Sequence, residues 1–402
     1  MSNYITPLFK KGYKCELSEG SIVTPVFRSS TFCFKNSEVG KRAFEIAYGL
    51  DEKKDNEDIS LIYSRVNNPN MEILENKLSL IEDSEESLIF SSGMSAISST
   101  FLSFLKPGDS IIFSTPTYGG TDCFFSYFLK NYDININKFN NTDYDDLEKK
   151  LKENNFKIIY VETPSNPLLT LTSIKKIVNL RDLYNKDALV VVDNTVCGPI
   201  FLKPLELGAD ISLYSVTKFI AGHSDVVAGS VSGKKHLLDK IKTTRTLLGC
   251  IADPDTCWLI QRSLPTLDLR MKKQMETTKY IVSKLQNNHF IDNIYYPGLN
   301  NDIDILKDEY KGSGSLFSFT INTNSENIFK FLNKVKIFQL AVSLGSVESL
   351  IQHPFSMTHS GLDNKTKLEY GITDKLIRCS VGLEDRDDLL NDIIESLNSV
   401  IS

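Results

Sequence analysis

The sequence predicts an α/β protein with a large, doubly wound, mainly parallel β-sheet domain and a smaller C-terminal α/β domain. From about residue 70 to residue 233, short strand patterns alternate with helical patterns at the spacing of βαβ units. Two of these strands, KIIYV and ALVVV, are uninterrupted apolar runs, which is typical of strands covered on both faces. After about residue 255 a long helix is followed by patterns that suit a mixed sheet.

Hydrophobic periodicity predicts the individual elements in chain order. Helices are expected at 70–82, 93–105, 121–132, 143–154 and 173–185. Strands are expected at 86–92, 107–115, 133–139, 156–164, 187–195, 209–217 and 226–233. The C-terminal part is expected to hold helices at 266–286, 326–335 and 384–400 and strands at 315–321 and 376–383. We place the domain boundary near residue 255.

Composition restricts the class of protein. The 402 residues are 41% hydrophobic and 24% charged, and a net charge of −6 gives no basic surface for nucleic acid. No apolar run approaches the roughly 18 residues that span a membrane, and MSNYITPLFKKGYK lacks the apolar core of a signal peptide. The seven cysteines are scattered, without the spacing of zinc ligands, which is typical of reduced thiols in the cytoplasm. We therefore expect a cytoplasmic protein without a metal site.

The residues after each strand are the candidates for chemistry, because ligands of open α/β sheets bind beyond the carboxyl ends of the strands. After ESLIF, the segment SSGMSA opens a helix, where small residues and helix N-terminal N–H groups favour an anion. Close packing of the helix on the strand is the alternative explanation. The sequence lacks GxxxxGK[ST], so no nucleotide-binding P-loop is expected.

Three further strand ends carry Tyr118, Asp193 and Lys218. A tyrosine between turn residues can stack on a flat ring or act as an interfacial aromatic residue. A carboxylate at the tip of an apolar strand needs a cation or donors, unless it caps a helix or turn. A half-buried lysine can bond covalently to a carbonyl carbon, and the hydroxyls of Ser215 and Thr217 can extend an anion site. An anion cradle, an aromatic ring, an acid and an amine at one sheet edge together suit pyridoxal phosphate (PLP).

The chain resembles the Cys/Met metabolism (cystathionine γ-synthase-like) family of fold-type I PLP-dependent enzymes over nearly its whole length. The resemblance rests on YSRVNNPN (63–70), SSGMSA (91–96), TYGGT (117–121), VETPSNP (161–167), VVVDNT (190–195), SVTKFIAGHSD (215–225), AVSLGSVESLIQHPFSMTH (341–359) and IRCSVGLED (377–385). It implies the fold-type I PLP-dependent transferase fold. It also implies an N-terminal arm at 1–65 that reaches a neighbouring subunit, a PLP-binding domain at 66–255 and a C-terminal domain at 256–402.

The resemblance implies a role for each matching residue. Lys218 would bind the cofactor covalently and shuttle protons, and Tyr118 would stack on the ring and is a candidate acid for the leaving group. The other implied cofactor contacts are Gly93, Met94, Asn166, Asp193, Ser215, Thr217, Tyr63 and Arg65. The implied substrate contacts are Arg378, Ser343 and Asn166. The family sends a pair like Tyr63 and Arg65 into the phosphate site of a neighbouring subunit, which implies a homotetramer, a dimer of dimers with shared active sites.

The segment LAVSLG resembles methionine γ-lyases, because Val342 precedes Ser343 where cystathionine synthases and lyases commonly carry Glu. An apolar side chain suits a methyl thioether, whereas a carboxylate suits a substrate with a distal ammonium group. The segments LIQHPFSMTHS and LEYGITDKLIRCSVGLED resemble the same enzymes. Two features differ from many bacterial methionine γ-lyases: Gly120 stands in place of Cys, and TTRTLLGCIADPD lacks their Lys-Asp dipeptide.

We therefore expect a carbon–sulfur lyase that performs α,γ-elimination on a small sulfur amino acid, L-methionine or homocysteine, to give 2-oxobutanoate, ammonia and a thiol. The alternatives are a cystathionine γ-synthase or γ-lyase, and an O-acetylhomoserine sulfhydrylase, which performs γ-replacement. A catalytically silent protein of this fold would be expected to lack Lys218, Asp193 or Arg378, and all three are present. The charged segment 41–60 is expected to be a solvated loop or a cover over a site formed between subunits.

Overall fold

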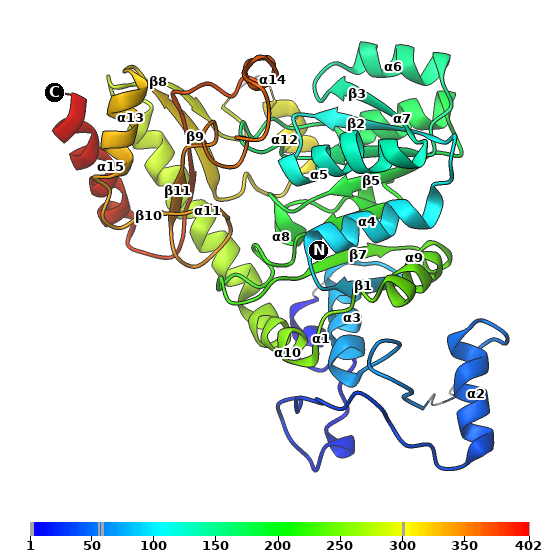
Figure 1. The fold of residues 1–402 in the computed structure, drawn as a ribbon. Coiled ribbons are helices and arrows are strands. Elements are labelled where there is room, and N and C mark those ends of the chain that lie inside the picture. The colour runs from blue at the N-terminus through cyan, green and yellow to red at the C-terminus, as the bar shows by residue number, and fades with distance from the viewer. Residues whose placement is uncertain (1–3, 55–56, 58–59, 300–301, 402) are drawn as a thin grey trace.

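The computed structural model describes residues 4–54, 57, 60–299 and 302–401 and contains two β-sheets (Figure 1). The strands of the larger sheet are β1 (Glu86–Phe90), β2 (Ser110–Thr115), β3 (Asn135–Asn140), β4 (Ile158–Glu162), β5 (Leu189–Asp193), β6 (Ile211–Tyr214) and β7 (Gly229–Gly233). Their order is β1-β7-β6-β5-β4-β2-β3, and only β7 pairs antiparallel with its neighbours. The predicted mainly parallel sheet is confirmed, and the carboxyl ends of the other strands lie at one edge.

Helices cover both faces of this sheet, as a doubly wound fold requires. One face is covered by α4 (Gly93–Phe104) and α9 (Lys235–Leu248), and the other by α3 (Pro69–Glu82), α6 (Tyr144–Glu153), α7 (Ile174–Tyr184) and α10 (Pro254–Ser263). Side chains alternate between the two cores along each strand: Val191 packs with the α4 face and Val190 with the α3 face. Both faces of β5 are therefore buried, which explains its uninterrupted apolar sequence.

The predicted helix at 121–132 lies within a continuous helical segment, but its winding changes along the way through three short elements. These are α5 (Gly119–Cys123), a π-helical turn (Phe124–Phe128) and a 3₁₀ turn (Leu129–Tyr132). The π turn seats Phe125 with its ring centroid 4.5 Å from that of Phe101 and 5.0 Å from that of Phe113. Helical spacing in the sequence therefore indicated the buried face correctly but not the change in winding, which tertiary packing decides.

The smaller sheet has the strands β8 (Ile291–Tyr295), β9 (Leu316–Ile321), β10 (Gln339–Leu340), β11 (Leu350–Gln352) and β12 (Leu376–Ser380). Their order is β10-β11-β12-β9-β8, and the sheet is mixed, as expected. The long α11 (Leu267–Leu285) packs against α15 (Arg386–Ile401), which also contacts α13 (Ser325–Leu332). This layer has a hydrophobic core of its own around Phe317 and Phe319. The prediction of a smaller second α/β unit is confirmed.

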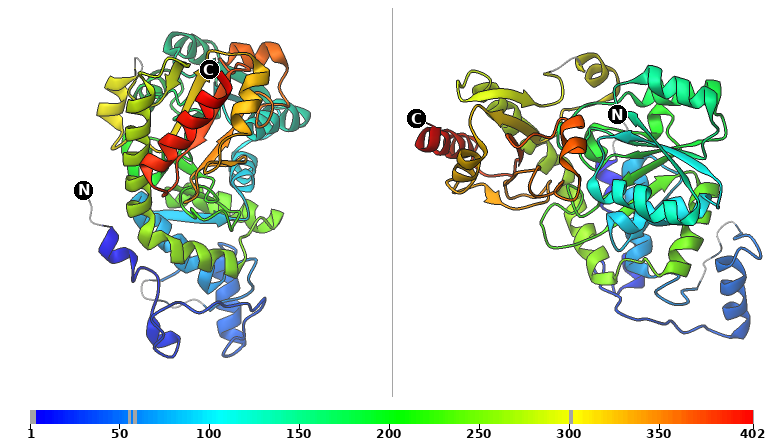
Figure 2. Two further views of the ribbon diagram at one scale, coloured as in Figure 1. Left: turned by 90° about the vertical axis from the view of Figure 1, so that its left-hand side faces the viewer. Right: turned by 45° about the horizontal axis from the view of Figure 1, so that its top comes forward.

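The remaining helices are short. They are α1 (Ile5–Leu8), α2 (Ser37–Ala47), α8 (Gly198–Phe201), α12 (Ile303–Glu309) and α14 (Asn364–Glu369), with 3₁₀ turns at Cys15–Leu17, Leu205–Leu207 and Leu264–Thr266. The N-terminal segment with α2 extends away from the two sheets in every view (Figure 2). Its side chains Ile22, Val23 and Tyr48 are exposed. Within the charged segment 41–60, residues 55, 56, 58 and 59 lie outside the described residues. Among the described residues, no helix is long and apolar enough to cross a membrane.

Candidate active site

The carboxyl ends of β4, β5 and β6 place the polar residues that the sequence singled out at one edge of the large sheet. Glu162 pairs with Asp193, and Asp193 pairs with Leu213, in parallel register. The turn that follows β6 carries Lys218. The smaller sheet faces this edge and contributes residues from the loop after β10 and from β12, as the contacts below show.

Lys218 lies in a tight turn that aims its amine at the loop after β10. Its backbone N–H donates to the carbonyl of Ser215 at 3.1 Å, and Gly222, with φ +72°, closes the turn onto the carbonyl of Lys218 at 2.7 Å. Its Nζ donates to Oγ of Ser343 at 2.8 Å. Burial, with a smaller contribution from the charge of Arg378, lowers the pKa of Lys218 to about 8. The amine can therefore give up its proton near neutral pH.

Ser343, which accepts this hydrogen bond, has an unusual backbone. Its φ is +118°, in the region that favours glycine. Such a conformation persists only where surrounding contacts hold it. The backbone carbonyl of Ser343 accepts a hydrogen bond from Arg378, and Gly345, two residues further on, packs closely on Phe219. The loop after β10 is thus fixed against the lysine turn.

Asp193 is 6% exposed and ends β5 beneath the lysine turn. Its Oδ2 accepts from the hydroxyl of Tyr160 at 2.9 Å, and its Oδ1 accepts from the backbone N–H of Thr195 at 3.0 Å. Burial raises the pKa of Asp193 above its ordinary value. Among the described residues no cation forms an ion pair with it, so the carboxylate can pair with a cationic ligand.

The start of α4 and the end of β6 form a narrow cradle. A Cβ added to Gly93 would lie 2.9 Å from Cβ of Ser215, so only glycine leaves room there. Ser92 caps α4 by accepting from the backbone N–H of Ser95 at 3.0 Å. In the described part of the chain, the Ser215 hydroxyl makes no hydrogen bond and is free to bind an anion.

Thr217 is placed differently from Ser215. Its hydroxyl donates to the carbonyl of Ala228 at 3.1 Å and accepts from the N–H of Ala228 at 2.9 Å. These contacts tie the lysine turn to the chain that enters β7. That both hydroxyls bind the cofactor phosphate stays a prediction; in the described part of the chain the Ser215 hydroxyl has no partner, whereas the Thr217 hydroxyl is bonded to the backbone of Ala228.

Tyr118 stands directly before α5 with 45% of its surface exposed. Its ring leaves no space beside Gly120, because a Cβ there would lie 2.6 Å from Cε1 of Tyr118 and 3.3 Å from the sulfur of Met94. The ring of Tyr118 and the side chain of Met94 thus meet at the same point. Any larger residue at position 120 would require the tyrosine ring to move from the position it takes here.

Arg378 is 3% exposed, and its guanidinium has only neutral partners. It donates to Oδ1 of Asn166 at 2.8 Å and to the carbonyl of Ser343. Gln352 lies opposite Arg378 on the neighbouring strand. With its amide oxygen turned towards the guanidinium, Gln352 accepts a hydrogen bond from Arg378 at 3.0 Å. Burial lowers the pKa of Arg378 to about 10. No described carboxylate pairs with this buried cation, so its guanidinium can accept the carboxylate of a ligand.

Tyr63 and Arg65 do not join this cluster within one chain. Arg65 donates to the carbonyl of Thr246 in α9 at 2.9 Å, and its guanidinium lies 6.0 Å from the centroid of the Tyr63 ring. Tyr63 is bridged to Thr31 of the N-terminal segment. That this pair reaches a cofactor of a neighbouring subunit stays a prediction.

The geometry fits PLP. The amine of Lys218, the carboxylate of Asp193 and the cradle of Gly93 and Ser215 offer partners for the aldehyde, the ring nitrogen and the phosphate. The cradle is closed to any side chain larger than hydrogen at Gly93, as a close approach of phosphate to backbone requires.

Comparison with known proteins agrees. The model of the Cys/Met metabolism PLP-dependent enzyme family matches residues 6–398. The chain belongs to this family. The chain is 36% identical over 385 residues to the L-methionine γ-lyase of Fusobacterium nucleatum subsp. polymorphum, covering 95% of this chain and 94% of that enzyme. It is also 36% identical over 385 residues to the cystathionine γ-lyase of Bacillus subtilis (strain 168), covering 95% of each.

Among solved structures, the cystathionine γ-lyase of Lactobacillus plantarum complexed with L-serine superposes with a TM-score of 0.88 at 33% identity, covering 99% of each chain. The protein is thus a PLP-dependent enzyme of Cys/Met metabolism with the fold of fold-type I enzymes, as the sequence predicted. The chain is equally similar to the methionine γ-lyase and to the cystathionine γ-lyase. Overall sequence identity therefore does not decide which of the two substrates this chain acts on.

Sequence reasoning assigned no role to Glu162, Gln352 or Tyr160. The signal for Glu162 was present, because it is a carboxylate at the tip of the apolar strand KIIYV, as Asp193 is at the tip of ALVVV. Gln352 and Tyr160 gave no comparable signal, because their roles depend on cross-strand and diagonal contacts with Arg378 and Asp193.

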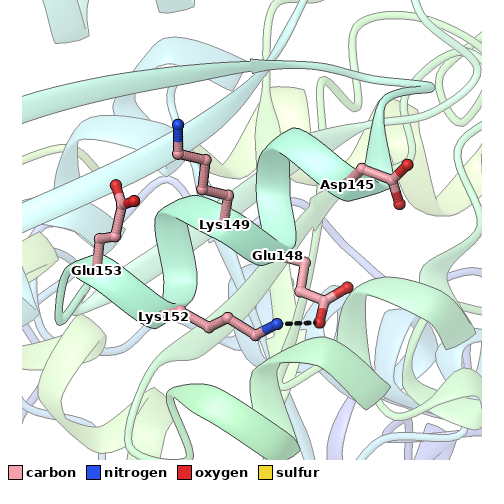
Figure 3. Close-up of a pocket in the computed structure, with 5 residues that line it drawn as sticks. All are labelled: Asp145, Glu148, Lys149, Lys152 and Glu153. Carbon is pink, nitrogen blue, oxygen red and sulfur yellow. Dashed lines mark ion pairs between the residues drawn. The ribbon is translucent and has the colours of Figure 1, made fainter.

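A hollow on the outer surface of α6 lies outside this site. Figure 3 shows its lining of Asp145, Glu148, Lys149, Lys152 and Glu153 on one exposed helix. Glu148 and Lys152, which are four residues apart and so lie one helical turn from each other, form an ion pair with an N–O distance of 2.6 Å. Charged pairs of this kind are typical of a solvated helix, and none of these residues follows a strand of the sheet.

Proposed function

We propose that the protein is a carbon–sulfur lyase that converts L-methionine or homocysteine to 2-oxobutanoate, ammonia and a thiol. The observation that carries this proposal is the position of Val342. It is 55% exposed and directly precedes Ser343, the hydrogen-bond partner of the Lys218 amine. We infer that this exposed apolar side chain, one residue from the partner of the reacting amine, faces the substrate, and an apolar contact there favours a substrate with an apolar thioether end. The similarity to an L-methionine γ-lyase along almost the whole chain supports the same substrate.

Lys218 is proposed to move the protons at Cα of the substrate. Bound PLP supplies a ring that withdraws electrons from the substrate. With its pKa lowered to about 8, the Lys218 amine is near the value at which a general base works best at neutral pH. The hydrogen bond from Nζ to Oγ of Ser343 holds the amine in one orientation while it takes or returns a proton. Asp193 would hold a proton on the ring nitrogen, because a buried carboxylate stabilises a nearby cation.

Tyr118 and Arg378 are proposed to act on the two ends of the substrate. The guanidinium of Arg378 would bind the α-carboxylate bidentately, and Asn166 would orient that guanidinium from its other side. The hydroxyl of Tyr118 would give a proton to the sulfur as the carbon–sulfur bond breaks. Water is the co-reactant: methionine and one water give 2-oxobutanoate, ammonia and methanethiol, so atoms balance without an oxidant or reductant.

Gly93, Met94 and Ser215 are proposed to hold the cofactor phosphate and ring, and Thr217 fixes the turn behind them.

Tyr63 and Arg65 are proposed to bind the cofactor phosphate of a neighbouring subunit, in a homotetramer that is a dimer of dimers. The support is that their contacts are with Thr246 and Thr31 and not with the cluster, and that the N-terminal segment with α2 extends away from the two sheets (Figure 1). A monomeric mass in solution at the working enzyme concentration would contradict this assembly. The arm at 1–65 and the division at residue 255 are part of the same proposal.

The second candidate is a cystathionine γ-lyase or γ-synthase, and the observation that favours it is the equal identity to a cystathionine γ-lyase. An O-acetylhomoserine sulfhydrylase activity is the third. A direct assay separates them: 2-oxobutanoate and volatile thiol are measured with methionine, cystathionine, and O-acetylhomoserine plus sulfide. We expect the highest kcat/KM with methionine. Activity with O-acetylhomoserine and sulfide alone would overturn the proposal.

Val342→Glu tests the substrate assignment within one protein. Placing a carboxylate beside the substrate should lower kcat/KM for methionine about 10-fold, because an apolar contact becomes a charged one, and should raise it for cystathionine, which carries a distal ammonium group. Leu340→Glu is the matched control, since Leu340 is an exposed apolar residue on the same segment. Equal changes in both variants, or no change in the ratio of the two substrates, would refute the role of Val342.

A further inference from the structure

Glu162 is a buried acid that the proposed mechanism does not use. It is the last residue of β4, is 3% exposed, and pairs in parallel register with Asp193. In the described part of the chain no cation forms an ion pair with it. Burial and the neighbouring Asp193 raise the pKa of Glu162 above its ordinary value. Burying a carboxyl group without a cation costs free energy, so the presence of Glu162 here needs a structural or functional reason.

The contacts of Glu162 join two loops at the edge of the sheet. Its Oε2 accepts from the hydroxyl of Thr117 at 2.9 Å and from the backbone N–H of Tyr118 at 2.7 Å. Its Oε1 accepts from the backbone N–H of Asn166 at 3.0 Å. One loop follows β2 and the other follows β4, so one side chain joins the two loops by hydrogen bonds.

We propose that Glu162 is a positioning residue, which holds the backbones of Tyr118 and Asn166 at a fixed separation and so sets the affinity of the protein for PLP. The inference rests on the proposed roles of Tyr118 as ring stacker and Asn166 as partner of Arg378. Both residues owe their position to the same acid: Tyr118 through Oε2 and Asn166 through Oε1. A shift of either loop would move the ring or the amide away from a cofactor bound to Lys218.

The isosteric variant Glu162→Gln is a sharp test. Both oxygens of Glu162 accept from a backbone N–H, so an amide at this position must turn its NH₂ group towards one of them. This conflict arises whether or not the acid carries a proton, because a protonated carboxyl can still accept at both oxygens. The variant changes no volume and creates no cavity.

Glu309→Gln is the matched control. Glu309 is also buried and accepts from a backbone N–H, that of Ile174 at 2.8 Å, and from the hydroxyl of Ser173. It joins α12 to α7 and touches no residue of the candidate active site. Glu162→Gln and Glu309→Gln therefore each replace a buried acid that accepts from a backbone N–H, one beside the proposed cofactor site and one away from it.

The experiment titrates each cofactor-free protein with PLP and measures the dissociation constant from absorbance. Circular dichroism in the absorption band of the bound cofactor then reports the environment of its ring. We expect Glu162→Gln to bind PLP at least 10-fold more weakly with an altered dichroic band, and Glu309→Gln to bind like the wild type. A Glu162→Gln protein with only a lower melting temperature, and with wild-type affinity and dichroism, would overturn the proposal.

Thr117→Val provides a second variant that keeps the acid and its charge. It removes one of the three donors, so a purely electrostatic role of Glu162 predicts no change. We expect a smaller weakening of PLP binding, about 3-fold, and a wild-type affinity would count against positioning even if Glu162→Gln fails to fold. The substrate assay of the wild-type enzyme is independent of these titrations, so failure of the inference and failure of the proposed function are distinguishable.

Discussion

Replacing Lys218 by alanine is expected to lower turnover of every substrate by more than about 10³-fold. The amine is the general base at Cα in the proposed mechanism, and general acid–base catalysis alone contributes about 10²–10⁴-fold. Its loss also removes the covalent attachment of the cofactor. The measurement is formation of 2-oxobutanoate from methionine with saturating PLP. Substantial remaining activity would refute the assignment of Lys218.

Lys77→Met is the matched control for this variant. Lys77 is a second buried lysine, and burial lowers its pKa as well, but it lies in α3 away from the strand ends. We expect Lys77→Met to change stability and to retain activity. A comparable loss of activity in both variants would mean that burial of a lysine, and not its place in the site, decides the outcome.

The acidity of Lys218 can be measured without turnover. In the cofactor-free protein an amine-selective acylating reagent should label Lys218 with a midpoint near pH 8, since burial and the charge of Arg378 favour the neutral amine. An ordinary lysine, with a pKa of about 10.4, would be labelled only at higher pH. Removing the guanidinium should move the midpoint upwards, because Arg378 is the second cause of the shift. Labelling is followed by mass spectrometry of the peptide.

Replacing Arg378 by lysine is expected to lower kcat/KM for methionine by about 10²-fold, mostly through a higher KM. Lysine keeps the charge but loses the planar pair of donors that matches a carboxylate. Truncating one partner of a buried charge pair costs about 2–5 kcal/mol, which corresponds to roughly 30-fold or more. The measurement is steady-state kinetics with methionine and with an amino acid amide that lacks the carboxylate.

The amide substrate makes the Arg378 prediction specific. The kcat/KM of Arg378→Lys for the amide should be close to that of the wild type, because the amide has no carboxylate for the guanidinium to bind. Arg386→Lys is the control, since Arg386 is an exposed arginine at the start of α15. An unchanged KM for methionine in Arg378→Lys, or an equal loss with the amide, would show that the guanidinium does not bind the α-carboxylate.

The sequence predicted the large sheet well because its signals are local. The alternation of strand and helix, and the apolar runs of β4 and β5, follow from burial on two faces and need no knowledge of distant contacts. The helical segment predicted at 121–132 is present, but its change to π winding was not predicted, since the π turn depends on how Phe125 packs between rings from α4 and β2. Hydrophobic periodicity predicts which face of such a helical segment is buried, but not whether it winds as an α-, π- or 3₁₀-helix.

The candidate site divides in the same way. By itself the sequence determined the fold class, the cofactor and the strand ends that carry Lys218 and Asp193, because these rest on residue type and on position after a strand. Only the tertiary structure decided that Ser343 accepts from Lys218, that Thr217 is bound to Ala228, and that Glu162 bridges two loops. Such contacts join segments far apart in the chain, and their geometry depends on strand register and side-chain packing, which hydrophobic periodicity does not encode.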